Sequence, residues 1–119
     1  VASEVDILVP NPVSFIVQKL LIHKYRKPKK KAQDVLYIHD TLDLFGASID
    51  QLRTIWAKQV RPAMAARTAK TAGNVGKQLF DKITDTTREA ALIPQDRRLS
   101  PERIRAACEF GLGEIFRDS

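Results

Sequence analysis

Residues 5–45 read VDILVPNPVSFIVQKLLIHKYRKPKKKAQDVLYIHDTLDLF, and this stretch decides the fold. It contains a short apolar segment, a turn marked by proline, an apolar helix, a basic loop and a second helix. Residues 5–9 are largely β-branched and stop at Pro10, which predicts a short strand. Asn11 and Pro12 then match the N-cap and the first position of a helix.

The helix expected from Asn11 to about Tyr25 has almost no polar face, which is typical of a helix buried nearly all round. Lys19 is the exception in its middle. A lysine in this position either extends its aliphatic stem to solvent or directs its ammonium at a partner. The residues alone leave both interpretations open.

The second helix is expected from about Lys30 to Phe45, with Pro28 breaking the chain in the loop before it and Gly46 ending it. Its apolar face has helical spacing and consists of Val35, Ile38, Leu42 and Phe45.

The rest of the chain predicts further helices. Ser48 is a candidate N-cap with Gln51 in a capping box, and residues 73–76 (GNVG) predict a turn or hinge. Asp85 is a candidate cap, and Ser100–Pro101 is a strong helix start. We therefore expect a mainly α protein, a bundle of about six helices with one short N-terminal strand.

The net charge of +6 has one source, a loop with six cations and no acid. These cations are Lys24, Arg26, Lys27, Lys29, Lys30 and Lys31. Such a patch attracts phosphate groups or nucleic acid, although a solvated loop between two helices is an equally simple interpretation. A second cluster, at residues 97–105, is offset by acids and is interpreted as a mixed-charge surface.

Composition limits the class of protein. The 119 residues fit one domain, and the single cysteine, Cys108, excludes an intrachain disulfide and suggests a reducing cytoplasm. No apolar run approaches the roughly 20 residues of a membrane span, so no membrane partner is expected. The chain begins with Val1 and shows no signal peptide, which suggests a cytoplasmic fragment of a longer protein.

The segments QKLLIHKYR (residues 18–26) and KKAQDVLYI (residues 30–38) place Lys19 and Asp34 15 positions apart across the basic loop. Over residues 5–46 the pattern resembles the C-terminal part of bacterial nucleotidyltransferase-like proteins of the polymerase-β-like superfamily, which include abortive-infection and toxin types. The resemblance implies that Lys19 contacts nucleotide phosphate. It implies that Asp34 is a catalytic-site acid that either holds a cation in position or lies near the metal–nucleotide site.

The same resemblance implies that Asp6, on the predicted strand, is a catalytic, metal-binding carboxylate. Residues 1–10 would be the last strand of a missing α/β core, and residues 11–119 the C-terminal helical domain. The full-length enzyme would use Mg²⁺ and a nucleoside triphosphate (NTP), and the basic loop would hold the phosphates or an acceptor such as RNA or tRNA. Many relatives carry an acid where this chain has Lys30–Lys31.

The Gly-Ser and Asp-x-Asp signatures of the catalytic half do not occur in the chain. This fragment alone is therefore expected to be inactive and to need a missing N-terminal catalytic domain as its partner. The alternative is a non-enzymatic helical module that binds nucleic acid or protein through the basic loop.

Overall fold

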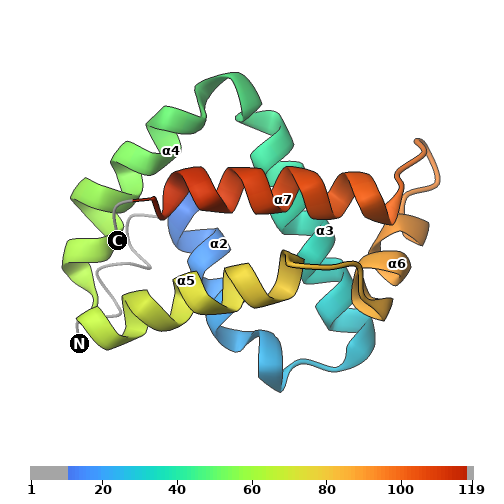
Figure 1. The fold of residues 1–119 in the computed structure, drawn as a ribbon, viewed down its shortest axis with the longest axis horizontal. Coiled ribbons are helices and arrows are strands. Elements are labelled where there is room, and N and C mark those ends of the chain that lie inside the picture. The colour runs from blue at the N-terminus through green and yellow to red at the C-terminus, as the bar shows by residue number, and fades with distance from the viewer. Residues whose placement is uncertain (1–10, 118–119) are drawn as a thin grey trace.

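The computed structural model describes residues 11–117, and within that range the chain is a bundle of six α-helices (Figure 1). The helices are α2 (Pro12–Ile22), α3 (Pro28–Leu44), α4 (Ile49–Ile55), α5 (Ala66–Phe80), α6 (Asp85–Leu92) and α7 (Pro101–Ile115). Short 3₁₀ turns η1 (His23–Tyr25), η2 (Gly46–Ser48) and η4 (Arg61–Ala63), and the π-helical turn η3 (Trp56–Val60), connect them. The predicted mainly α bundle is confirmed, whereas the predicted strand and Asp6 lie outside the described residues.

Helix α2 is the centre of the bundle and starts as predicted. The Asn11 side chain accepts a hydrogen bond from the Ser14 N–H, the Ser14 hydroxyl bonds back to the Asn11 backbone, and Pro12 holds the first position. Antiparallel helices α5 and α7 lie side by side and α2 crosses behind them (Figure 1). The buried residues of α2 are Val13, Ile16, Val17 and Leu20, which lie on one face of the helix, and the others are half-buried or exposed, so the helix is less enclosed than its composition predicts.

Helix α3 begins earlier than predicted. Pro28 is its first residue and does not break the chain beyond it, because a proline at that position has no N–H that the helix would need. The predicted apolar face is confirmed, since Val35, Ile38 and Leu42 are all buried. Helix α3 packs against both α6 and α7.

The segment after α3 differs from its prediction. Ser48 precedes α4, but its side chain makes no capping hydrogen bond, so the predicted capping box with Gln51 is absent. The helix widens into the π-helical turn η3 at Trp56. The Trp56 indole is buried and packs edge-to-face on Phe116 of α7, with ring centroids 4.7 Å apart. Aromatic packing of this geometry ties the end of α7 to this side of the bundle.

The hinge predicted at residues 73–76 is wrong, because α5 runs unbroken through both glycines. Gly76 is buried where α5 crosses α7, and a Cβ there would lie only 3.2 Å from Leu112 Cδ1. The glycine therefore serves close helix packing, and its lower helix propensity is offset by contact between the helices.

Of the caps predicted for α6 and α7, the first is wrong and the second is confirmed. Asp85 is not the cap of α6, since Thr84 takes that position and exchanges hydrogen bonds with Thr87. For α7 the prediction is confirmed: the Ser100 hydroxyl accepts from the Arg103 N–H and Pro101 is the first residue. No helix within residues 11–117 is long and apolar enough to cross a membrane.

Two glycines of α7 give a matched test of this packing. A Cβ at Gly111 would lie 2.9 Å from Leu42 Cδ1 and 3.2 Å from its Cγ, whereas a Cβ at Gly113 meets nothing within 4 Å. Both alanine substitutions gain about 1 kcal/mol of helix propensity. Only Gly111→Ala overpacks the buried Leu42, so we expect it to be less stable than Gly113→Ala by about 1–3 kcal/mol in urea unfolding. Equal stabilities would show that α3 and α7 are not packed this closely.

Candidate functional site

Asp34 joins the two helices on either side of the basic loop. Its carboxylate is almost fully buried, with a side-chain exposure of 2%, and it accepts contacts from two cations. Lys19 Nζ of α2 lies 3.2 Å from Oδ1. Arg26 Nε donates to Oδ2 at 2.9 Å and its terminal nitrogen donates to Oδ1 at 3.3 Å. The structure therefore brings together the lysine and the aspartate that the sequence singled out.

Local structure explains why these three groups meet. Helix α2 and the 3₁₀ turn η1 carry the chain to Arg26, whose extended backbone ends the turn. Helix α3 then returns beside α2, so Asp34 lies in its second turn, facing both. A planar guanidinium suits two-point contact with a carboxylate, which explains why the loop supplies an arginine here among lysines.

Lys19 has an aromatic as well as an acidic environment. Its Nζ lies 5.2 Å from the ring centroid of Phe15 and 5.7 Å from that of Tyr37. Both distances fall within the range of cation–π attraction. The lysine side chain keeps 16% of its surface exposed, so it is neither enclosed nor freely mobile. Its ammonium is held in one place at the edge of the basic loop.

The rest of the predicted basic loop is cationic, but its residues from Pro28 on form the first turn of α3, and Lys31 is half-buried. Lys24, Lys27, Lys29 and Lys30 are exposed, and none of them forms an ion pair with a residue of the described range. The first turn of α3 contains no acid, and its N-cap residue Lys27 makes no side-chain cap. A helix N-terminus carries partial positive charge, so lysines at this end repel it and destabilise the helix. The arrangement favours an anion at this position.

His23 belongs to the same region but contributes little charge at neutral pH. Burial lowers the pKa of His23 below 6.5, the nearby Lys31 lowers this pKa further, and Asp34 opposes both effects. The unfolded chain therefore binds the proton more readily than the folded chain. The stability that neutral His23 contributes is lost as the pH falls below about 6.5.

The other polar residues singled out by the sequence have structural partners. His39 is buried and its Nδ1 lies 3.0 Å from Asp40 Oδ1. Burial raises the pKa of Asp40, but hydrogen bonds from Arg97 and His39 outweigh it and the net pKa is lowered. Cys108 is buried, and burial raises the pKa of its thiol. Within residues 11–117 no cluster of three His, Cys, Asp or Glu residues could hold a metal ion.

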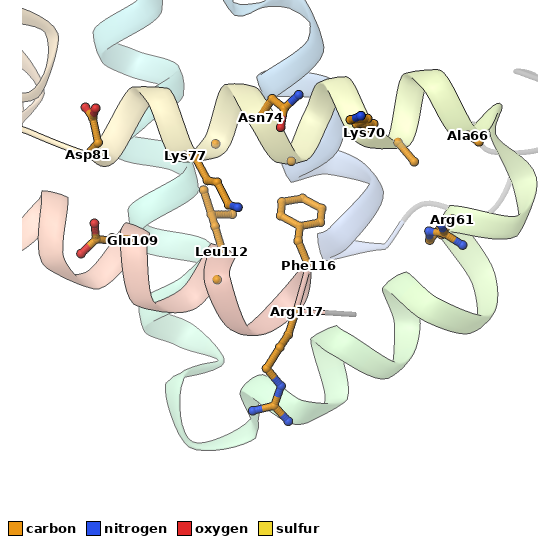
Figure 2. A pocket seen from close by; sticks show the side chains of 14 residues that line it. Arg61, Ala66, Lys70, Asn74, Lys77, Asp81, Glu109, Leu112, Phe116 and Arg117 are labelled. Carbon is orange, nitrogen blue, oxygen red and sulfur yellow. The ribbon is translucent and has the colours of Figure 1, made fainter. Parts of the chain in front are cut away.

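A separate cavity of about 950 Å³ opens between α5 and α7 (Figure 2). Figure 2 shows Asp81 and Glu109 at one end, Arg61 at the other, and the Phe116 ring between the helices. The residues that line it do not include Lys19, Asp34 or any cation of the basic loop. The cavity is therefore distinct from the Asp34 site.

No family model, no curated protein and no solved structure matches this chain. The resemblance to nucleotidyltransferases stays a prediction that rests on the residue pattern around Lys19 and Asp34.

Sequence reasoning missed three members of the site. Arg26 was treated as one more cation of the patch, although it is the closest partner of Asp34. Phe15 and Tyr37 were not singled out, because they flank Lys19 only once α2 and α3 pack together. Spacing gives a partial signal for Phe15, which precedes Lys19 by four residues on one helix.

The role of Asp34 in holding the helices together can be tested by substitution. Asp34→Asn keeps the shape but leaves two cations without their carboxylate. We expect a loss of about 2 kcal/mol in unfolding free energy, below the roughly 3–5 kcal/mol of fully buried pairs, because both cations retain contact with water. Asp43→Asn on the same helix is the control. It is exposed, and its effect should stay within about 0.5 kcal/mol. Equal effects of the two substitutions would contradict the role assigned to Asp34.

Proposed function

We propose that this chain is the helical part of a metal-dependent nucleotidyltransferase, which moves a nucleotidyl group from an NTP to an acceptor. In this proposal Lys19 contacts the triphosphate, and the basic loop binds acceptor phosphates, for example those of RNA or tRNA. The observation that carries the proposal is the Lys19 ammonium, fixed 3.2 Å from buried Asp34 and partly exposed beside the cationic loop.

A fixed lysine is well suited to bind phosphate. Immobilising a free, flexible side chain on binding costs roughly 0.5–1.5 kcal/mol, and Asp34 together with the two rings already reduces that cost. An ammonium has three N–H donors. The 3.2 Å contact with Asp34 is an ion pair, and it leaves N–H donors for phosphate oxygens. Two cations share one carboxylate, so the cluster keeps a positive charge.

The geometry favours a positioning role for Asp34 over a metal-binding one. Both of its oxygens already accept contacts from Lys19 or Arg26. The described residues do not offer a ligand set for Mg²⁺. In this proposal the metal ligands are therefore carboxylates of an N-terminal catalytic domain, with Asp6, outside the described residues, as a candidate among them.

The proposed reaction is a nucleotidyl transfer. An acceptor hydroxyl oxygen forms a bond to the α-phosphorus, the bond from that phosphorus to the bridging oxygen breaks, and pyrophosphate leaves with the electron pair. The hydroxyl proton passes to a base of the catalytic domain. Negative charge is distributed over the phosphate oxygens throughout, so a lysine held in place stabilises it without having to reorganise.

The test is NTP binding by the product of the complete gene. With Mg²⁺ present, Lys19→Met should weaken binding of each of the four NTPs about 10-fold or more, because hydrogen bonds to charged groups contribute roughly 1.5–3 kcal/mol. Isothermal titration calorimetry measures the affinities and circular dichroism checks the fold. Lys58→Met is the control, an exposed lysine in η3.

Two results would overturn the proposal. One is a wild-type protein that binds none of the four NTPs. The other is equal binding by wild type, Lys19→Met and Lys58→Met, which would leave Lys19 a structural residue. The coding sequence upstream of Val1 is an independent check, since the proposal requires a Gly-Ser and Asp-x-Asp pair there.

A second candidate function, a non-enzymatic nucleic-acid-binding module, is favoured by a different observation. Three exposed lysines, Lys27, Lys29 and Lys30, lie at the uncapped N-terminus of α3, where they reduce stability. A charge arrangement that costs stability and attracts phosphate is consistent with binding to a nucleic acid backbone.

Lys29→Glu separates stability from binding at this position. An acid in the first turn of α3 should raise unfolding free energy by about 0.3–1 kcal/mol. The same variant should bind single-stranded RNA more weakly, and the slope of log affinity against log salt should become shallower. Lys70→Glu, in the middle of α5, is the control with the same change of net charge. Wild-type protein that does not bind RNA, or binding that is insensitive to salt and to Lys29→Glu, would exclude the second candidate.

A further inference from the structure

We propose that Phe15 and Tyr37 form a platform for the nucleobase of the NTP whose phosphates contact Lys19. This inference rests on the proposed function and adds to it a site for the base. The juxtaposition that carries it is a pair of exposed aromatic rings, one from each helix, on either side of a lysine that is itself fixed.

The two rings touch and are nearly perpendicular, so a base would stack on the face of one ring beside the edge of the other. Phe15 of α2 and Tyr37 of α3 have centroids 5.9 Å apart and meet edge-to-face at 87°. Neither ring belongs to the core, since Phe15 is 37% and Tyr37 55% exposed. The contact between them fixes both rings, because edge-to-face packing is the preferred geometry of aromatic pairs. The result is an apolar surface that is rigid and open to solvent.

Lys19 places the proposed phosphate-binding ammonium beside the two rings. Its Nζ lies within 6 Å of both ring centroids, at 5.2 Å and 5.7 Å. A nucleotide carries an aromatic base and an anionic phosphate on one ribose, so it needs an aromatic surface and a cation close together. Phe15, Tyr37 and Lys19 provide that combination, and the exposed lysines of the loop extend the cationic side.

Stacking of a nucleobase would give the two exposed rings a role in binding. Every nucleobase has an aromatic face, and stacking on an aromatic side chain strengthens binding without selecting one base. The platform therefore predicts binding of all four NTPs, with the base contributing in each case. A surface that contacted phosphate alone would gain nothing from the base.

The experiment compares NTPs with inorganic tripolyphosphate, which has the same chain of phosphates and no base or ribose. With Mg²⁺ present, the complete gene product should bind ATP about 10-fold more tightly than tripolyphosphate, the difference expected from one stacked base. Charge alone predicts the opposite order, because tripolyphosphate is at least as negative as ATP. The variants Tyr37→Leu and Phe15→Leu should abolish the preference for ATP over tripolyphosphate, and any loss caused by the missing contact between the ring and Lys19 should weaken both ligands equally.

Two control variants test whether a loss of the ATP preference comes from altered folding and not from the missing ring. Phe110→Leu replaces an aromatic side chain that is 64% exposed on α7 and should keep the ATP preference. Tyr37→Phe retains the ring and should also keep it. Thermal unfolding of each variant confirms that the bundle is intact.

The outcomes separate this inference from the proposed function. If wild type binds tripolyphosphate and ATP equally, the phosphate site stands and the platform is wrong. An ATP preference that persists in both leucine variants places the base elsewhere and also overturns the platform. If neither ligand binds, the proposed function fails and the platform fails with it. Loss of the preference in the leucine variants alone supports the platform.

Discussion

The buried carboxylate of Asp34 is the interaction on which the arrangement of α2, the basic loop and α3 depends. A carboxylate with only 2% of its side chain exposed is costly unless cations and hydrogen bonds satisfy it. Lys19 and Arg26 do so from two different segments, and Arg26 makes two hydrogen bonds to the carboxylate. The angle between the helices is consequently fixed by charge as well as by apolar packing. The same contacts hold the Lys19 ammonium at the edge of the cationic loop. Asp34 therefore both joins the helices and positions the lysine that we propose to bind phosphate.

Buried glycines allow the other helices of the bundle to pack closely. Gly76 and Gly111 are buried where α5 meets α7 and where α7 meets α3, and Leu112 and Leu42 occupy the space that side chains there would need. Close approach of the helices compensates for the weak helix propensity of glycine. Phe116, directly after α7, packs on Trp56 and also lies close to Gly76, between α5 and α7 (Figure 2). Asp34 and Lys19 lie away from these contacts, near the start of α3 and the end of α2, where the Lys19 side chain keeps 16% of its surface exposed.

The charges at the start of α3 are arranged against helix stability. The first turn of α3 carries lysines where a helix N-terminus favours acids, and no side chain caps it. Several other charges within residues 11–117 are paired, as in Arg97 with Asp40 and Arg53 with Glu114. An anionic ligand would relieve the repulsion at α3. This cluster of lysines, next to a fixed lysine and two exposed rings, is the physical basis for proposing phosphate and nucleotide binding.

The sequence by itself determined the helical class, the start of α2 at Asn11–Pro12 and the start of α7 at Ser100–Pro101, whereas the resemblance only singled out Lys19 and Asp34 as candidate site residues. The helical class and the two helix starts depend on helical periodicity and local capping, which a sequence carries. Only the tertiary structure decided that α5 continues through Gly73 and Gly76, because helix packing there outweighs local propensity. It alone showed that Arg26 is the second partner of Asp34 and that Phe15 and Tyr37 flank Lys19. Contacts between helices depend on how the helices pack, and a linear pattern does not contain that information.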